Sequence, residues 1–327
     1  MIDGTSTFLI LLVALLLDRV IGDPDWLWRR LPHPVVLFGN AISFAEKRFN
    51  RPEIAASQRE KYGFITIAIL LISSVVIGAF FSAVFSWGGL VGIVIETVIV
   101  AVFLAQKSLA DHVGAVSAGL RKDGVEGGRK AVSMIVGRNA ATLDEAGVAR
   151  AAIESLAENA SDGVIAPAFW YAIFGLPGLF AYKMLNTADS MIGHMSERYR
   201  AFGRASAKFD DFANWVPARL TGGLIILGGE LNNIEDNFRV MIRDAKLHRS
   251  PNAGWPESAM AAVCNLALGG PRNYAGGDIA DEPFMNDVGD KNANADDIDH
   301  AIGVFWRAMT LATIAVALLA LLAFLNF

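Results

Sequence analysis

Long uncharged stretches alternate with polar blocks along this chain of 327 residues. Between Lys61 and Lys107 the only charged residue is Glu96. A stretch of this length holds two apolar helices of about 20 residues each. We therefore expect membrane spans near 64–85 and 89–106.

The two ends of the chain are apolar as well. Ala308–Phe327 carries no charge, which predicts a third span near 305–325. Residues 4–17 are also uncharged, but a helix of that length covers only about 21 Å of a hydrocarbon layer of about 30 Å. Charged flanking residues that snorkel can extend its reach, and we expect a span near 4–20.

One further apolar stretch, residues 164–182, is interrupted by Pro167, Gly175 and Pro177. A full crossing there would place the following basic residues outside, against the bias of Lys and Arg toward the cytoplasm. It would also require a second crossing near 216–229. We favour a re-entrant or broken helix pair, because interrupted backbone at membrane depth is tolerated where protein or a water-filled cavity covers it. Full spans at both places stay open.

The distribution of basic residues predicts the orientation. The loop 18–63 carries eight Lys and Arg, whereas the turn at 86–89 carries none. This bias places 18–63 and 107–307 in the cytoplasm and both termini outside. We expect a multi-pass protein of the cell (inner) membrane, with a cytosolic catalytic block at about 107–300 and an active site on the cytoplasmic side.

Composition agrees with a membrane location. The chain is 54% hydrophobic and only 19% charged, below the roughly 25% charged of soluble domains. Its net charge of −5 gives no general attraction to nucleic acid. Alternating strand-like runs are scarce. We predict an all-α, polytopic integral membrane protein with a large helical cytosolic portion, organised as a single membrane-embedded domain over 1–327.

An acidic pattern precedes the interrupted stretch. Leu143–Asn159 is predicted as a helix, on which Arg150, Glu154 and Glu158 share one face, and Asp162 follows it. An exposed ion-paired stripe is the ordinary interpretation. The alternative is a carboxylate site for Mg²⁺, which prefers hard oxygen ligands and binds one or two carboxylates together with phosphate oxygens.

Polar residues emerge again where the interrupted stretch ends. Lys183, Asn186 and Asp189 lie along or near one side of a predicted helix. Charged and amide side chains next to an apolar segment require partners, because unpaired charges are costly there. They form either a structural polar network or part of a functional site.

Basic residues follow, among them Arg198 and Arg204. Arg recognises phosphate through its planar fork of donors, although a solvated basic face or attraction to anionic lipid also fits. The adjacent Asp210 and Asp211 cannot point the same way from a helix, so we expect one ligand and one supporting group.

A stiff loop lies further along, at His248–Glu257. Two prolines and a glycine restrict its backbone, so that it can present Asn252 and Trp255 to a ligand. The chain has no Gly-Lys dipeptide, which excludes a P-loop. It also lacks HExxH, CxxC and GxSxG. Any nucleotide must therefore bind outside these standard motifs.

Several of these segments together resemble one family. The runs Glu154–Pro167 and Asn186–Met191 are similar to the signature of the membrane-bound adenosylcobinamide-phosphate synthases of cobalamin biosynthesis, the CobD/CbiB family. Arg198–Arg200, Ser250–Glu257 and Gly269–Pro271 match as well. The resemblance extends over nearly the whole chain, in several long motifs in the same order.

The resemblance implies an ATP-dependent amide ligase. Such an enzyme joins adenosylcobyric acid to aminopropanol phosphate, or to free aminopropanol, giving adenosylcobinamide phosphate. ATP and Mg²⁺ are the implied cofactors. The expected roles are Mg²⁺ binding by Glu154, Glu158 and Asp162; catalysis by Asp189, Lys183 and Glu158; phosphate binding by Lys183, Arg198 and Arg204; and substrate positioning by Asn159, Asn186, Asn252 and Trp255.

Two other classes are also weighed. A transporter would carry charges inside full spans, and only Glu96 fits that description. A non-catalytic membrane scaffold for corrinoid enzymes would need no carboxylate cluster beside cations. For the enzyme we expect membrane lipid and other membrane-bound cobalamin-assembly enzymes as partners, and we expect the acids before 164–182 and the cations after it to converge.

Overall fold

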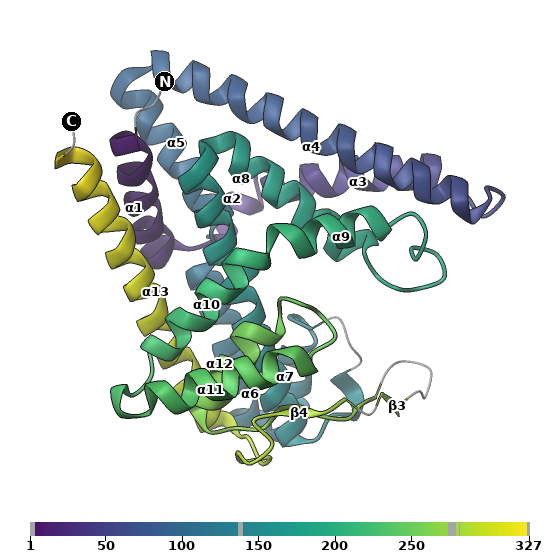
Figure 1. The fold of residues 1–327 in the computed structure, drawn as a ribbon, viewed down its shortest axis with the longest axis vertical. Coiled ribbons are helices and arrows are strands. Elements are labelled where there is room, and N and C mark those ends of the chain that lie inside the picture. Colours follow the sequence, from purple (N-terminus) through teal and green to yellow (C-terminus); the bar gives the residue numbers. More distant parts are fainter. Residues whose placement is uncertain (1–3, 137–139, 274–278, 281, 326–327) are drawn as a thin grey trace. The chain divides into compact units, whose positions relative to one another are not determined.

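The computed structural model is almost wholly α-helical (Figure 1), which confirms the predicted fold class. Short strand pairs and 3-10 turns account for the remaining regular structure of the described part of the chain. The described residues are 4–136, 140–273, 279–280 and 282–325.

Contacts divide the chain into two compact units, and each is described by itself. Whether the chain acts as one domain, as its sequence predicts, stays a prediction. Unit 1 comprises Met1–Ala105, Ala166–Asn214 and Val316–Phe327, and unit 2 comprises Gln106–Ile165 and Trp215–Ala315.

Unit 1 is organised around one long interrupted helix, α8, which packs against α3, α4 and α9. Its core contains Ile42 from α3, Ile67 from α4 and Phe202 before α9. These side chains are almost fully buried. The helices of this unit are α1 (Gly4–Ile21), α2 (Asp25–Trp28), α3 (Pro34–Phe49), α4 (Ala56–Trp87), α5 (Gly89–Phe103), α8 (Ala166–Ile192) and α9 (Arg204–Ala213).

Unit 2 contains the remaining helices. In it α7 packs against α6 and α12, and α12 packs against α10 and α11. Two antiparallel pairs, β1–β4 and β2–β3, follow α12. Its elements are α6 (Gln106–Val132), α7 (Glu145–Asn159), the π-helix η2 (Ala160–Ile165), α10 (Trp215–Leu227), α11 (Ile234–Asp244), α12 (Gly254–Cys264), β1 (Leu268–Gly269), β2 (Arg272–Asn273), β3 (Ile279–Ala280), β4 (Phe284–Met285), α13 (Ala295–Leu325, whose end belongs to unit 1) and the 3-10 turns η1 (Ala140–Thr142), η3 (Leu231–Asn233) and η4 (Ala245–Leu247).

Four helical segments of the described chain are long and apolar enough to cross a membrane. On α4, large apolar side chains such as Ile69, Ile72 and Phe80 are more than half exposed, as expected for a surface solvated by lipid. The helices predicted near 64–85, 89–106 and 305–325 are confirmed, and α1 corresponds to the helix predicted at 4–20. Their sidedness stays a prediction. The four segments are Ala56–Trp87, Gly89–Val132, Glu145–Ile192 and Ala295–Leu325.

The predicted break in 164–182 is present within α8. Gly175 has φ 63° and ψ −149°, a conformation that is open essentially only to glycine. A Cβ on Gly178 would lie 2.4 Å from the Trp170 carbonyl oxygen, so the chain turns sharply onto itself. Pro177 lies in the first turn of the second half, where its missing N–H is tolerated. The broken helix pair is confirmed, but whether it crosses the membrane stays a prediction.

Residues 166–174, before the break, continue the helix formed by α7 and η2, and the whole segment Glu145–Ile192 is long and apolar enough to cross a membrane. Helix α10, with 13 residues, reaches only about 20 Å and is too short for a full crossing by itself. The length of α10 therefore argues against the second crossing near 216–229, whereas a crossing at 164–182 stays a prediction.

Candidate functional sites

Acidic side chains from α8 and α9 meet within unit 1. Asp189 lies near the end of α8, and Asp210 and Asp211 lie on α9. Asp210 is buried and Asp211 is exposed, so the two neighbours point in different directions, as the sequence predicts. Asn214 Nδ2 donates to Asp210 Oδ2 at 2.9 Å. Together with Asn186, these four residues form what we call the carboxylate cluster.

The carboxylate cluster has unusual electrostatics. Burial and, to a smaller extent, the nearby charges of Asp189 and Asp211 raise the pKa of Asp210 to about 7, although hydrogen bonds from Asn214 and Asn186 act to lower it. Burial also raises the pKa of Asp211. A carboxyl group that titrates near neutral pH beside a second carboxylate can accept a proton or bind a cation.

A hydrogen-bonded support holds this cluster in place. Tyr182 on α8 donates its hydroxyl to Asn214 Oδ1 at 2.9 Å, and both residues are buried. Asn214 therefore receives one hydrogen bond while it donates another to Asp210. This arrangement fixes the Asn214 amide so that its NH₂ group faces the carboxylate. Asn186 also hydrogen-bonds Asp210, so Asp189 and Asn186 belong to one polar network, and a functional role for them stays a prediction.

Two predicted phosphate-binding residues of unit 1 are already in ion pairs. Arg198 Nε and Nη2 donate to the two carboxylate oxygens of the buried Glu46, each at 3.0 Å. Asn50 Nδ2 donates to the Arg198 carbonyl oxygen at 3.0 Å. Arg204 Nη1 lies 2.8 Å from Glu60 Oε1. Both Arg side chains are mostly exposed, and their roles toward phosphate stay predictions.

The predicted acids of unit 2 lie at the end of α7. Asp144 caps this helix and accepts a hydrogen bond from the Gly147 N–H at 2.7 Å. Glu154 is buried, and its Oε1 accepts a hydrogen bond from the Gly269 N–H at 2.8 Å. The exposed-stripe interpretation therefore does not hold for Glu154. Glu158 is exposed and Asp162 is half-buried.

Asp162 lies in the π-helix η2, which follows α7 directly. Such wider turns occur frequently at functional sites. Asn159 Nδ2 donates to the Ser155 carbonyl oxygen at 2.9 Å within its own helix. Among the described residues, no three His, Cys, Asp or Glu side chains are grouped so that they could hold a metal ion. Mg²⁺ needs only one or two carboxylates when phosphate oxygens complete its shell, so the predicted metal site stays a prediction.

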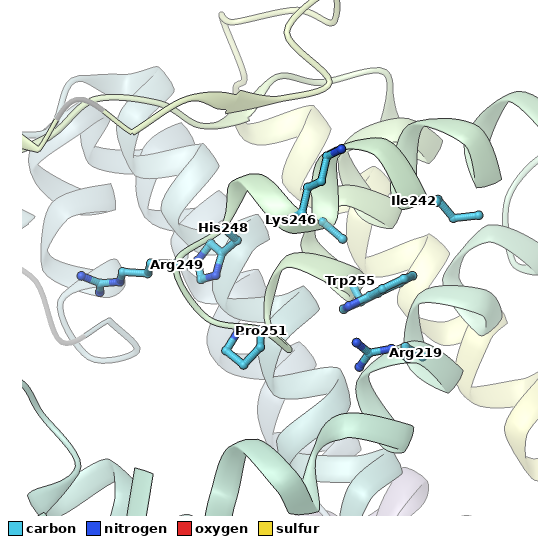
Figure 2. A pocket seen from close by; sticks show the side chains of 8 residues that line it. Arg219, Ile242, Lys246, His248, Arg249, Pro251 and Trp255 are labelled. Atoms are coloured by element: carbon cyan, nitrogen blue, oxygen red, sulfur yellow. The ribbon is translucent and has the colours of Figure 1, made fainter. Parts of the chain in front are cut away.

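Unit 2 also contains a cavity of about 380 Å³ between α10, α11 and the loop before α12. Figure 2 shows the Arg219 guanidinium beneath the indole ring of Trp255, whereas the side chains of Lys246 and Arg249 point away from these two residues. Arg219 Cζ lies 4.4 Å from the ring centroid of Trp215 and 4.4 Å from that of Trp255. We call this cavity the cationic pocket. It is lined by Arg219, Ile242, Ala245, Lys246, His248, Arg249, Pro251 and Trp255.

The stiff loop predicted at His248–Glu257 positions Trp255 in this pocket. Ser250 Oγ accepts hydrogen bonds from the backbone N–H groups of Asn252 and Ala253 at 3.3 and 3.2 Å, a local pattern that fixes the turn. His248 Nε2 lies 3.7 Å from Glu257 Oε1. The loop is therefore held at both ends. Asn252 is buried, whereas Trp255 lines the pocket.

Three cations of the pocket were missed as site residues by sequence reasoning. Arg219 follows Trp215 by one helical turn, which is a local signal for stacking. Its second aromatic partner, Trp255, comes from a different helix, and no spacing rule predicts that contact. Lys246 lies two residues before the stiff loop and Arg249 lies within it, and neither belongs to a recognised motif. The relation of this pocket to the residues predicted in unit 1 stays untested.

These features define a class: an all-helical membrane protein with a buried carboxylate cluster in one unit and a cationic pocket in the other. The family described as CobD/Cbib protein matches residues 11–305. The chain belongs to the CobD/CbiB family, whose members act in cobalamin biosynthesis. The predicted resemblance is confirmed.

Individual relatives agree over almost their full length. The chain is 56% identical over 321 residues to the "Cobalamin biosynthesis protein CobD" of Brucella anthropi, covering 96% of this chain and 98% of the relative. It is 55% identical to the protein of the same name from Rhizobium meliloti, covering 97% and 98%. The Rhodobacter capsulatus protein of that name is 43% identical, covering 95% and 97%. No solved structure matches the chain.

Proposed function

We propose that the chain catalyses ATP-dependent amide ligation of adenosylcobyric acid to aminopropanol phosphate, or to aminopropanol, giving adenosylcobinamide phosphate. Membership of a cobalamin biosynthesis family over residues 11–305 supports a corrinoid substrate. The observation in the structure that carries the proposal is the carboxylate cluster, because amide formation needs a group that accepts a proton near neutral pH.

The chemistry sets clear requirements. A carboxylate is a poor electrophile, so ATP would transfer its terminal phosphoryl group to the propionate side chain of the corrinoid, giving an acyl phosphate and ADP. The amine would then attack the acyl carbon and release phosphate as the amide bond forms. The amine is protonated in water at neutral pH and must lose that proton before or during attack.

The carboxylate cluster suits this proton transfer. The charges of Asp210 and Asp189 interact with each other. Because the pKa of Asp210 is about 7, its protonated and deprotonated forms are present in comparable amounts at neutral pH. Asp189 is the less buried of the two, so it would receive the proton directly. The charge of Asp210 would raise the affinity of Asp189 for the proton. The amides of Asn186 and Asn214 would stabilise the charged form of Asp210.

Mg²⁺ would neutralise phosphate charge during phosphoryl transfer. The donor set fits: Glu158 and Asp162 offer carboxylate oxygens that are not fully buried, and oxygen ligands suit this ion. Glu154 would support them from behind, because one of its oxygens holds the Gly269 N–H. Lys183, Arg198 and Arg204 would add positive charge toward phosphates, and Asn159, Asn186, Asn252 and Trp255 would orient substrate.

The location follows the same line of argument. We propose the inner membrane, with the active site on the cytoplasmic side where ATP is available. The corrinoid is large and partly apolar, so a membrane-bound enzyme could pass its product to later membrane-bound enzymes of corrinoid assembly. Normal pathway flux with a solubilised, separated enzyme would contradict this transfer.

A transporter is less well supported. Glu96, the intramembrane charge that favoured it, is buried in α5, and its Oε1 accepts a hydrogen bond from the Tyr171 hydroxyl at 2.8 Å. That bond ties α5 to α8 within unit 1. A structural role therefore explains this residue, and a transport path needs further charges inside the spans.

Purified protein in detergent tests the proposal. With adenosylcobyric acid, ATP, Mg²⁺ and aminopropanol phosphate, we expect ADP release matched one-to-one by adenosylcobinamide phosphate. Each reactant is omitted in turn as a control. ADP release that does not depend on the amine, or no product at all from folded protein, would exclude ligation and leave the scaffold as the better explanation.

A further inference from the structure

We propose that the cationic pocket binds a phosphate monoester through Arg219. This extends the proposed function, on which it rests, by naming the group that recognises the amine substrate: the phosphate of the aminoalcohol. The pocket lies in unit 2, outside the residues assigned to phosphate from the sequence. Its volume of about 380 Å³ suits a small phosphorylated molecule, since ligand pockets begin at about 300 Å³.

The first argument is the preorganisation of Arg219. Its guanidinium lies over the rings of Trp215 and Trp255, 4.4 Å from each centroid. Nη1 also donates to the Trp215 carbonyl oxygen at 2.6 Å. These contacts fix the plane of the guanidinium and leave its remaining N–H edge for a ligand. A planar donor edge of this kind matches two phosphate oxygens at once.

The second argument is charge. Three of the eight lining residues are Arg or Lys, and none is Asp or Glu. Among the described residues, no carboxylate forms an ion pair with Arg219, and Lys246 interacts with the charge of Asp244. By contrast, the nearby Arg239 and Arg243 pair with acids of their own helix. An excess of cationic over acidic side chains around a cavity attracts an anion.

The third argument is the apolar surface beside the cations. Trp215 and Ile242 are more than half exposed, and both lie at or next to the pocket. A carbon chain attached to the phosphate can pack there. The same chemistry occurs on a soluble aminoalcohol phosphate and on the headgroup of phosphatidic acid. A binding experiment has to distinguish these two sources.

The main experiment measures equilibrium binding of radiolabelled aminopropanol phosphate to the full chain in detergent, without ATP or corrinoid. We expect Arg219→Gln to raise the dissociation constant by about tenfold or more, as for loss of a charge-assisted hydrogen bond. Arg219→Lys should also weaken binding, because an ammonium lacks the planar fork. The matched control is Arg239→Gln, which removes an exposed Arg of the same unit and should bind normally.

Competition identifies the ligand chemistry. Inorganic phosphate should displace the probe, and free aminopropanol should not. Displacement by nanodiscs with phosphatidic acid, but not by phosphatidylcholine nanodiscs, would assign the pocket to a lipid monoester rather than to the substrate. Normal binding by Arg219→Gln, or equal competition by free aminopropanol, would overturn the proposal.

A second measurement uses only wild-type protein, so it does not depend on how a variant folds. Phenylglyoxal modifies accessible guanidinium groups, and peptide mass spectrometry quantifies the adduct on Arg219. We expect aminopropanol phosphate to protect Arg219 while Arg239 stays reactive. Unchanged modification of Arg219 would contradict the site. Neither binding assay requires turnover. Both can therefore contradict the phosphate site while the ligation assay succeeds, and both can support the site while the ligation assay fails.

Discussion

The two units hold charge in opposite ways. In unit 1, the carboxylate of Asp210 is buried among amides and beside a second acid, which raises its pKa to about 7. In unit 2, Arg219 is held at the surface by two indole rings and keeps an edge toward solvent. Burial of like charges suits proton transfer, whereas stacking of a cation suits anion binding. In the proposed reaction, unit 1 would supply the proton acceptor and unit 2 would bind the phosphate.

The largest expected effect is on catalysis by the carboxylate cluster. Asp189→Asn should lower the rate of amide formation by about 100-fold or more, because the proton acceptor is lost. Binding of aminopropanol phosphate to the cationic pocket should not change. Product formation and probe binding are measured on the same preparation, with Glu53→Gln, which changes an exposed acid of unit 1 outside the cluster, as the control. A full rate for Asp189→Asn would remove this residue from catalysis.

The second prediction concerns metal binding by the acids of unit 2. Glu158→Gln and Asp162→Asn should each raise the Mg²⁺ concentration needed for half-maximal ADP release by about tenfold or more. Glu145→Gln changes an exposed acid in the first turn of the same helix and should have no such effect. Near-normal Mg²⁺ dependence in both variants would exclude the two residues as ligands.

The third prediction tests the corner that precedes Asp189. Gly175→Ala should destabilise the protein by about 1–3 kcal/mol, because alanine rarely adopts its backbone conformation. Gly223→Ala on α10 is the matched control, since its added methyl group meets open space. Thermal unfolding in detergent measures both. Equal melting temperatures of the Gly175→Ala and Gly223→Ala variants would show that the backbone conformation at Gly175 does not require glycine.

The last prediction concerns the pH dependence of stability. Asp210 has its pKa raised from 3.8 to about 7 in the folded protein, so the folded state binds this proton more tightly than the unfolded state does. The stabilisation from this group is complete below pH 3.8 and is lost as the pH rises through about 7. Melting temperatures between about pH 5 and pH 8 should therefore fall in wild type, and fall less in Asp210→Asn. Identical slopes would contradict the assignment.

Local features of the fold could be predicted from the sequence. Uncharged runs predicted the helices α4, α5 and α13, because hydrophobicity is a property of the segment itself. The break at Gly175 also depends on nearby residues only. The equivalent corner at Gly124 in α6, with φ 63° and ψ −152°, was missed because it lies in a polar helix without a proline nearby.

Contacts between distant segments could not be predicted in this way. Asp210 meets Asp189 only because α9 packs against α8, and Trp255 meets Arg219 only because α12 packs against α10. Residue type and spacing indicated that Asp189 and Trp255 could act, but they did not indicate with which partners. The same limit explains why Arg198 was assigned to phosphate although Glu46 holds its guanidinium.

The single-residue corners at Gly124 and Gly175 also determine how the topology can be mapped. A reversal of helix direction at a single glycine has no loop residues that could accommodate an insertion. A reporter inserted there would disrupt the turn, and its signal would come from misfolded protein. Glu53 and Ser196 lie in exposed connecting segments and can carry an insertion. The side of the membrane on which each loop lies is therefore best measured with reporters at these two loops. A reporter that gives no signal after insertion at either glycine corner carries no topological information.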